Sequence, residues 1–171
     1  NGLGSTSPVT DTIELFSPSG IHTCYNLLNP SAVESVGPEF PYQDYDSLVD
    51  KCNLSGVGTV AIRILAGGAL TGSFERHPIS AQEVAPISTG ESINDDVNES
   101  LNYSFLVDEG YVESLSEAAI RFVVSSKKID TALIGLSNLN HLEHAVSAVE
   151  KGPLGKEVLE KITKARKEFF D

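Results

Sequence analysis

Short apolar runs alternate with amphipathic stretches along this chain. The clearest run is Val57–Leu65, which is almost continuously apolar, as expected for a strand buried on both faces of a parallel sheet. Ile21–Tyr25 and Thr131–Ile134 are shorter runs that also predict strands, and Asn1–Gly4 could be the end of another. The alternation predicts an α/β fold with parallel strands and right-handed crossovers.

Apolar residues at helical spacing lie between and after the predicted strands. Ser114 and Glu117 have the spacing of a capping box, which marks the start of a helix. The segment Gly72–Asp96 is rich in Ser, Pro, Gly and acidic residues, and it predicts a long loop. Helices are predicted over Pro8–Phe16, Tyr42–Leu54, Asn98–Glu109, the stretch from Ser114 onward, His141–Val149 and Val158–Phe169.

The length of the chain limits how much of a barrel it can form. A closed (β/α)8 barrel takes eight strands and typically about 250 residues, whereas this chain has 171 residues. The pattern therefore predicts a single domain over residues 1–171 that is half of a TIM barrel, with parallel strands and outer helices. An unrelated α/β domain is the alternative. The chain begins at Asn1 rather than Met, which suggests that the protein starts upstream.

Charge and composition exclude several classes of partner. The chain has 24 acidic and 12 basic residues and a formal net charge of −12, which argues against binding to nucleic acid. No apolar run approaches the roughly 20 residues of a membrane helix, and no signal peptide is visible. Cys24 and Cys52 have no metal-binding spacing and are expected to be reduced, buried thiols. These features predict a cytoplasmic protein with neither a metal site nor a membrane segment.

Three segments, taken in order, resemble the aldo-keto reductases. Tyr25–Ser31 is similar to the end of that family's sixth strand, and Gly56–Gly72 to its seventh strand and following loop. Leu133–Glu143 is similar to the eighth strand and the next helix start, and Ala118–Phe122 to the helix before it. The resemblance covers nearly the whole chain and implies the C-terminal half of the barrel, from about strand five to strand eight.

Two shorter segments suggest a branch of the family. Asn26-Leu-Leu-Asn-Pro30 and Glu75-Arg-His-Pro78 are similar to segments of the aldose or galactose dehydrogenase-like members. The resemblance implies hydride transfer between nicotinamide and a small carbonyl or sugar substrate. The family's catalytic Asp, Tyr, Lys and His lie on the first four strands, and no residue here matches them. We therefore expect the N-terminal half of the same barrel as a partner, and no activity from this chain alone.

The turn after the predicted strand Thr131–Ile134 is the best candidate for binding a phosphate. Gly135 follows the strand, and Ser137 and Asn138 stand where a helix begins, so that free backbone N–H groups can hold an anion. The resemblance places the adenosine phosphate of NAD or NADP here. Asn138 stands where NADP-binding members often have Arg or Lys, which favours NAD slightly. The alternative is that Ser137 or Asn138 only caps the helix.

The other candidates are weaker. Leu65, Ala66, Gly67 and Gly68 follow the strand Val57–Leu65, and glycines let a backbone approach a ligand closely. The resemblance places this loop against the pyrophosphate; the alternative is a tight strand exit. The resemblance places five further residues near the nicotinamide or the adenine. Ile62, with Arg63 beside it, stands where the family often has a stacking aromatic, and His22 stands where it has a Gln that binds the carboxamide. The remaining two are Ser5 and Glu143.

Each of these weaker candidates has a structural alternative. His22 is equally typical of a hydrogen-bonded core histidine, and Glu143 of a solvated helix face. Two classes of function therefore remain open. The first is half of an NAD(P)-dependent oxidoreductase. The second is a truncated or degenerate reductase that binds a nucleotide or a partner without catalysis.

Overall fold

The computed structural model describes residues 5–81, 83–87 and 92–170. Three strands form a parallel sheet in chain order: β1 (Gly20–Cys24), β2 (Gly58–Ile62) and β3 (Thr131–Ala132). The α/β class and the sequential parallel pairing are as predicted, although β2 and β3 are shorter than their apolar runs and β1 begins and ends one residue earlier than its run. The predicted strand end over residues 1–4 lies outside the described residues.

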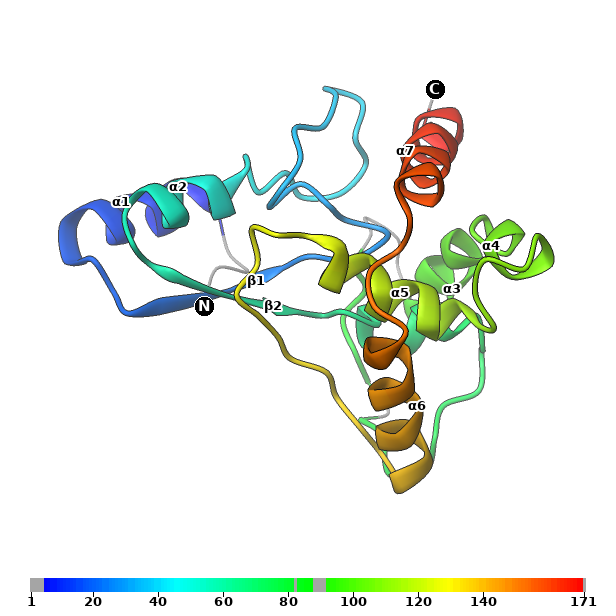
Figure 1. Ribbon diagram of the computed structural model, residues 1–171. Helices are drawn as coiled ribbons and strands as arrows, with labels where there is room; N and C mark the ends of the chain where they lie inside the picture. The colour runs from blue at the N-terminus through cyan, green and yellow to red at the C-terminus, as the bar shows by residue number, and fades with distance from the viewer. Residues whose placement is uncertain (1–4, 82, 88–91, 171) are drawn as a thin grey trace.

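Helices lie on one side of this sheet and beyond the ends of its strands (Figure 1). α1 and α2 lie together on one side, and α3 to α5 gather at the far end of the strands, with α6 and α7 following α5 and β3 in the chain. The helices are α1 (Thr6–Phe16), α2 (Leu48–Leu54), the short 3-10 helix η1 (Ala66–Thr71), α3 (Ile93–Leu101), α4 (Phe105–Asp108), α5 (Leu115–Ser125), α6 (Leu139–Glu150) and α7 (Lys156–Phe170).

The predicted helix over Tyr42–Leu54 is wrong in its first half. Asp46 and Ser47 have φ angles of 50° and 49°, a left-handed conformation that a right-handed helix cannot contain. α2 therefore starts only at Leu48. The helical spacing of apolar residues gave a wrong prediction here, because Tyr42 and Tyr45 are buried although they belong to an irregular segment.

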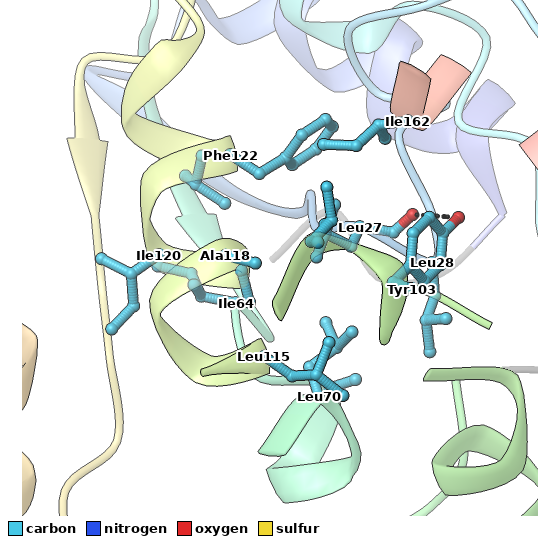
Figure 2. Packing of buried hydrophobic residues seen from close by; sticks show 14 of the residues in the cluster. Leu27, Leu28, Ile64, Leu70, Tyr103, Leu115, Ala118, Ile120, Phe122 and Ile162 are labelled. Atoms are coloured by element: carbon cyan, nitrogen blue, oxygen red, sulfur yellow. Dashed lines mark hydrogen bonds between the residues drawn. The ribbon is translucent and has the colours of Figure 1, made fainter. Parts of the chain in front are cut away.

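The predictions for the next region, the loop Gly72–Asp96 and the helix Asn98–Glu109, also need correction. α3 begins earlier, because Ser92 and Asp95 form a capping box there. The helix then breaks after Leu101, where the amide of Tyr103 donates to the carbonyl of Ser100 at 3.0 Å in a tight turn. That turn buries the Tyr103 ring and lets its hydroxyl donate to the carbonyl of Leu27 at 3.1 Å (Figure 2).

The start of α5 is capped as predicted, but only in part. The Ser114 hydroxyl accepts a hydrogen bond from the amide of Glu117 at 3.1 Å. The buried Glu117 carboxylate instead accepts from the amide of Glu113 and from the side chains of Arg121 and Lys151. Burial raises the pKa of Glu117, but the hydrogen bonds from Lys151 and Arg121 outweigh it, so the pKa lies below its usual value.

Two apolar cores flank the sheet. The smaller one joins α1 and α2 to β1 through Ile13, Leu48 and Cys52. The larger one is centred on α5, where Ala118 and Phe122 pack against the turn after β1 and the exit of β2 (Figure 2). Both cysteines are buried and free, as predicted.

One flank of the molecule leaves apolar residues uncovered. α6 packs on α5 through the small residues Ala145 and Ala148. Within the described ranges, β3 pairs only with β2, and both of its residues are exposed. The outward face of α6 carries Leu139, Leu142, Val146 and Val149, which are 74%, 44%, 48% and 51% exposed.

α7 is anchored to the strand end by one buried cation. Arg166 is 6% exposed, and its Nη1 lies 3.0 Å from Oε2 of Glu34. Its Nη2 donates to the carbonyl of Leu27 at 3.4 Å, and its guanidinium lies 5.7 Å from the centroid of the Phe122 ring. α7 thus closes over the turn after β1.

We expect the substitution Arg166→Met to lower the free energy of unfolding by about 1–3 kcal/mol, because it removes hydrogen bonds made by a buried charged group. The control is Lys164→Met on the same helix, whose exposed pair with Glu168 at 3.6 Å contributes no more than about 0.5 kcal/mol. Urea unfolding of the full-length protein measures both variants. Equal stability of the two would show that Arg166 does not anchor α7.

Candidate functional site

A buried asparagine joins the carboxyl ends of β1 and β2. Asn26 is fully buried, and its Nδ2 donates to the carbonyl of Arg63 at 2.8 Å. Its Oδ1 accepts from the amides of Leu28 and Asn29, both at 2.9 Å. Every polar atom of this side chain therefore holds backbone at one of the two strand exits. The arrangement fixes the path of the chain as it leaves β2.

The backbone after β2 turns through repeated left-handed conformations. Arg63 and Ala66 have φ angles of 60° and 49°, and Gly67 and Gly68 have φ angles of 68° and 110°. A Cβ atom on Gly67 would lie 2.6 Å from Cγ1 of Val84. The glycines thus form a tight strand exit with another part of the chain pressed against it, which is the structural alternative considered from the sequence.

The loop after η1 folds back over this exit. Nη1 of Arg76 donates to the carbonyl of Gly67 at 2.8 Å, and its Nε donates to the carbonyl of Ala81 at 2.9 Å. Arg63 reaches the same loop, with Nη1 lying 3.5 Å from the carbonyl of Ala85. The two guanidinium groups therefore tie the loop to the end of β2.

The loop also contacts the start of α6. The Ser80 and Ser137 hydroxyls lie 2.8 Å apart, and the rings of His77 and His141 meet edge to face with centroids 5.7 Å apart. Asn138 caps α6, since its Oδ1 accepts a hydrogen bond from the amide of His141 at 2.8 Å. The capping role considered for Asn138 is therefore confirmed.

A cavity of about 830 Å³ lies between these elements. The exits of β2 and β3, the loop after η1 and the starts of α5 and α6 form its walls. Its volume lies within the range of small-molecule and cofactor sites. Of the residues predicted from the sequence, it brings together Arg63, Leu65, Gly67, Gly68, Gly135 and Ser137.

The other predicted residues lie outside the lining of this cavity. Ile62 and Ala66 are adjacent in the chain to residues that line it, and Glu143 is exposed on α6. His22 is exposed on β1, so the interpretation as a core histidine is wrong. Ser5 is exposed at the start of α1. The cofactor roles of these residues, and of the capping residue Asn138, stay predictions.

Sequence reasoning missed several polar residues in the walls. Arg76, His77 and Ser80 come from the long loop, and His141 and His144 from α6. Nε2 of His144 lies 3.0 Å from the hydroxyl of Ser116. The Arg76-His77 pair in an otherwise acidic loop is the signal that could have pointed to the loop residues.

The cavity is rich in cationic and hydrogen-bonding groups although the chain carries a net charge of −12. Among the described residues, neither Arg63 nor Arg76 forms an ion pair with a carboxylate. Glu75 is an acidic residue in the lining. Unpaired guanidinium groups in a concave site favour an anionic ligand, and phosphate above all.

In the parts of the chain that the structure describes, no group of three or more His, Cys, Asp or Glu side chains is arranged to hold a metal ion. No helix there is both long enough and apolar enough to cross a membrane.

Comparison with known proteins identifies the family. Residues 32–167 match the aldo/keto reductase family, and the chain therefore belongs to it. The family consists of NAD(P)-dependent oxidoreductases, which generally use NAD(P)H. The parallel sheet with outer helices is consistent with part of a TIM barrel. Among curated proteins, none matches this chain.

We expect Gly67→Ala to destabilise the protein by about 1–2 kcal/mol, because the left-handed conformation disfavours a side chain and the new Cβ would meet Val84. The matched control is Gly135→Ala, whose Cβ would meet nothing within 4 Å. We expect this control to change stability by less than about 0.5 kcal/mol. Urea unfolding and limited proteolysis of the loop check both variants. A Gly67→Ala protein as stable as the control would contradict the packing described here.

Proposed function

We propose that this chain is the C-terminal half, about strands five to eight, of an NAD(P)-dependent oxidoreductase barrel, and that its cavity holds the phosphates of the cofactor. The observation that carries the proposal is the position of Arg63 and Arg76. Both line one cavity next to the glycine exit of β2, and neither is paired with a carboxylate among the described residues. In a chain this acidic, such a site is suited to a dinucleotide.

Two segments would hold the phosphate-bearing part of the cofactor. Leu65–Gly68, with Arg63 and Arg76 beside it, would face the pyrophosphate. Gly135–Asn138 would face the adenosine phosphate, where the chain leaves β3 and enters α6. The bound cofactor supplies the hydride that is exchanged with a carbonyl group. The residues that protonate the carbonyl oxygen belong, in this proposal, to the other half of the barrel.

The uncovered flank supports a partner of this kind. β3 has an exposed edge, and α6 presents a Leu and Val stripe outward. A further β/α unit of the same barrel would pair with that edge and cover that stripe. We propose that the N-terminal half supplies this unit together with the catalytic residues. The substrate would be a small carbonyl or a sugar, as the resemblance to aldose dehydrogenase-like members suggests.

We expect the full-length protein to oxidise NADH or NADPH in the presence of an aldehyde or to reduce NAD(P) with an aldose, as followed by absorbance. The chain over residues 1–171 alone should give no turnover above buffer, because the described lining of the cavity contains no lysine that could assist a general acid there. Turnover by this chain alone would show that we have misplaced the catalytic residues. An inactive full-length protein that still binds the cofactor would favour a degenerate reductase without catalysis.

Cofactor preference should follow the charge at residue 138, with NAD preferred or nearly equal to NADP in the natural protein. Asn138→Arg should strengthen NADP binding by on the order of 1–2 kcal/mol, as expected for a hydrogen bond to a charged group, and leave NAD nearly unchanged. Because Asn138 caps α6, Asn138→Ala is the matched control that loses the same cap without gaining a cation. Calorimetry of the full-length variants measures both affinities. Much tighter NADP binding in the natural protein, with no gain from Asn138→Arg, would rule out this alignment.

A further inference from the structure

Two serines and a histidine form a hydrogen-bonded cluster on the cavity wall, where the start of α5 meets α6. Oγ of Ser116 lies 3.0 Å from Nε2 of His144, and Oγ of Ser114 lies 3.2 Å from the same nitrogen. The two hydroxyl oxygens are 3.0 Å apart. All three residues line the cavity but belong to neither of the segments proposed for the cofactor phosphates. A serine hydroxyl held by an imidazole inside a cavity has the geometry of a nucleophile next to its base.

Ser116 is the serine whose hydroxyl is available to react. Ser114 is the N-cap of α5, and its Oγ already accepts a hydrogen bond from the amide of Glu117 at 3.1 Å. Among the described residues, Oγ of Ser116 is hydrogen-bonded only to Ser114 and His144, and no backbone group holds it. Ser116 and His144 are both half-buried, so a ligand in the cavity can reach them. When Nε2 of the ring carries no proton, it accepts the serine hydroxyl hydrogen and can remove it.

The start of α5 can stabilise the negative charge that an attack by Ser116 would create. The first amides of a helix have no acceptor within it, and its N-terminus carries a partial positive charge. In α5 these are the amides of Leu115 and Ser116, because the amide of Glu117 already donates to Ser114. Backbone amides of this kind stabilise the oxyanion that forms during acyl transfer. The first turn of α5 and one side chain of α6 thus supply a nucleophile, a base and oxyanion donors.

We propose that Ser116, with His144 as its general base, hydrolyses a carboxylic ester in this cavity. In the first step Oγ attacks the carbonyl carbon and its proton passes to Nε2, which gives it to the leaving alcohol as the ester C–O bond breaks. In the second step water attacks the acyl group on Ser116 and loses a proton to Nε2, and Oγ recovers that proton as the acid leaves. Ester and water give acid and alcohol, and nothing is oxidised or reduced. This activity is additional to the proposed function and does not depend on it.

The charge of the cavity indicates which esters it accepts. Arg63 and Arg76 line the same cavity, and neither forms an ion pair with a carboxylate among the described residues. Guanidinium groups in this state favour a ligand with a carboxylate or phosphate group. The ester is therefore one whose acid or alcohol part carries a negative charge, such as a half-ester of a dicarboxylic acid.

The test follows the release of p-nitrophenolate by the full-length protein. The neutral probe is p-nitrophenyl acetate, and the anionic probe is the mono-p-nitrophenyl ester of glutaric acid. Relative to the rates in buffer, we expect kcat/KM to be about tenfold higher for the anionic ester, as for one hydrogen bond to a charged group. Ser116→Ala and His144→Gln should each lower kcat/KM about a hundredfold, as for the loss of a nucleophile or its general base. The matched control is Ser147→Ala, which removes an exposed serine of α6 and should change nothing.

Covalent labelling gives a second measurement that a purely structural role of Ser116 would not affect. A fluorophosphonate should modify Ser116 in the natural protein and in Ser147→Ala, as read by mass spectrometry of the peptides, and His144→Gln should slow this reaction. Urea unfolding shows whether each variant is folded. An unlabelled Ser116, or ester hydrolysis that is equally fast in a folded Ser116→Ala protein, would overturn the inference.

The remaining outcomes separate the parts of the inference from one another and from the proposed function. Full activity in His144→Gln would remove His144 from the role of base. Equal use of the two esters would overturn the assignment of a charged ester alone. Calorimetry with NAD and NADP tests the proposed function by itself. A protein that binds neither dinucleotide but hydrolyses esters through Ser116 would contradict the proposed function and support this inference.

Discussion

The hydrogen bond from Asn26 to the carbonyl of Arg63 is the constraint on which the site depends. A buried amide must satisfy its donors and acceptors inside the protein. Here Nδ2 donates to the carbonyl of Arg63 and to Sγ of Cys24, and Oδ1 accepts from two backbone amides at the exit of β1. The left-handed turn at Arg63 is held in place from β1. The glycine exit, the loop above it and one wall of the cavity take their positions from this bond.

The cavity has walls of two kinds. The exits of β2 and β3 are attached to the sheet, whereas the wall that carries Arg76, His77 and Ser80 is a loop held by side-chain contacts. This division matches a common plan of α/β proteins, in which a sheet positions loops that carry the binding groups. It also places basic groups together in an acidic chain, so that the local charge of the cavity differs in sign from the overall charge.

The sequence was sufficient to predict the strands, their parallel order and most helices, because apolar periodicity directly reflects burial in a sheet or helix. The prediction failed at Tyr42–Leu54. The same periodicity arose there because Tyr42 and Tyr45 are buried although they belong to an irregular segment, which also contains the left-handed Asp46 and Ser47. The part of the cavity formed by Gly67 and Ser137 was predictable, because glycines after a strand and a polar residue before a helix can be recognised from the neighbouring sequence alone. The contact between His77 and His141 was not, because only the tertiary fold brings a loop and a helix start together.

The uncovered Leu and Val stripe of α6 and the open edge of β3 have a consequence for colloidal behaviour. An exposed strand edge beside apolar side chains is a template for association between copies. At neutral pH, repulsion between chains that carry a charge of −12 opposes such contacts. Near the isoelectric point of about 4.6 that repulsion disappears while the apolar surface remains. The acidity of this chain therefore opposes association through the open edge of β3 and the apolar face of α6.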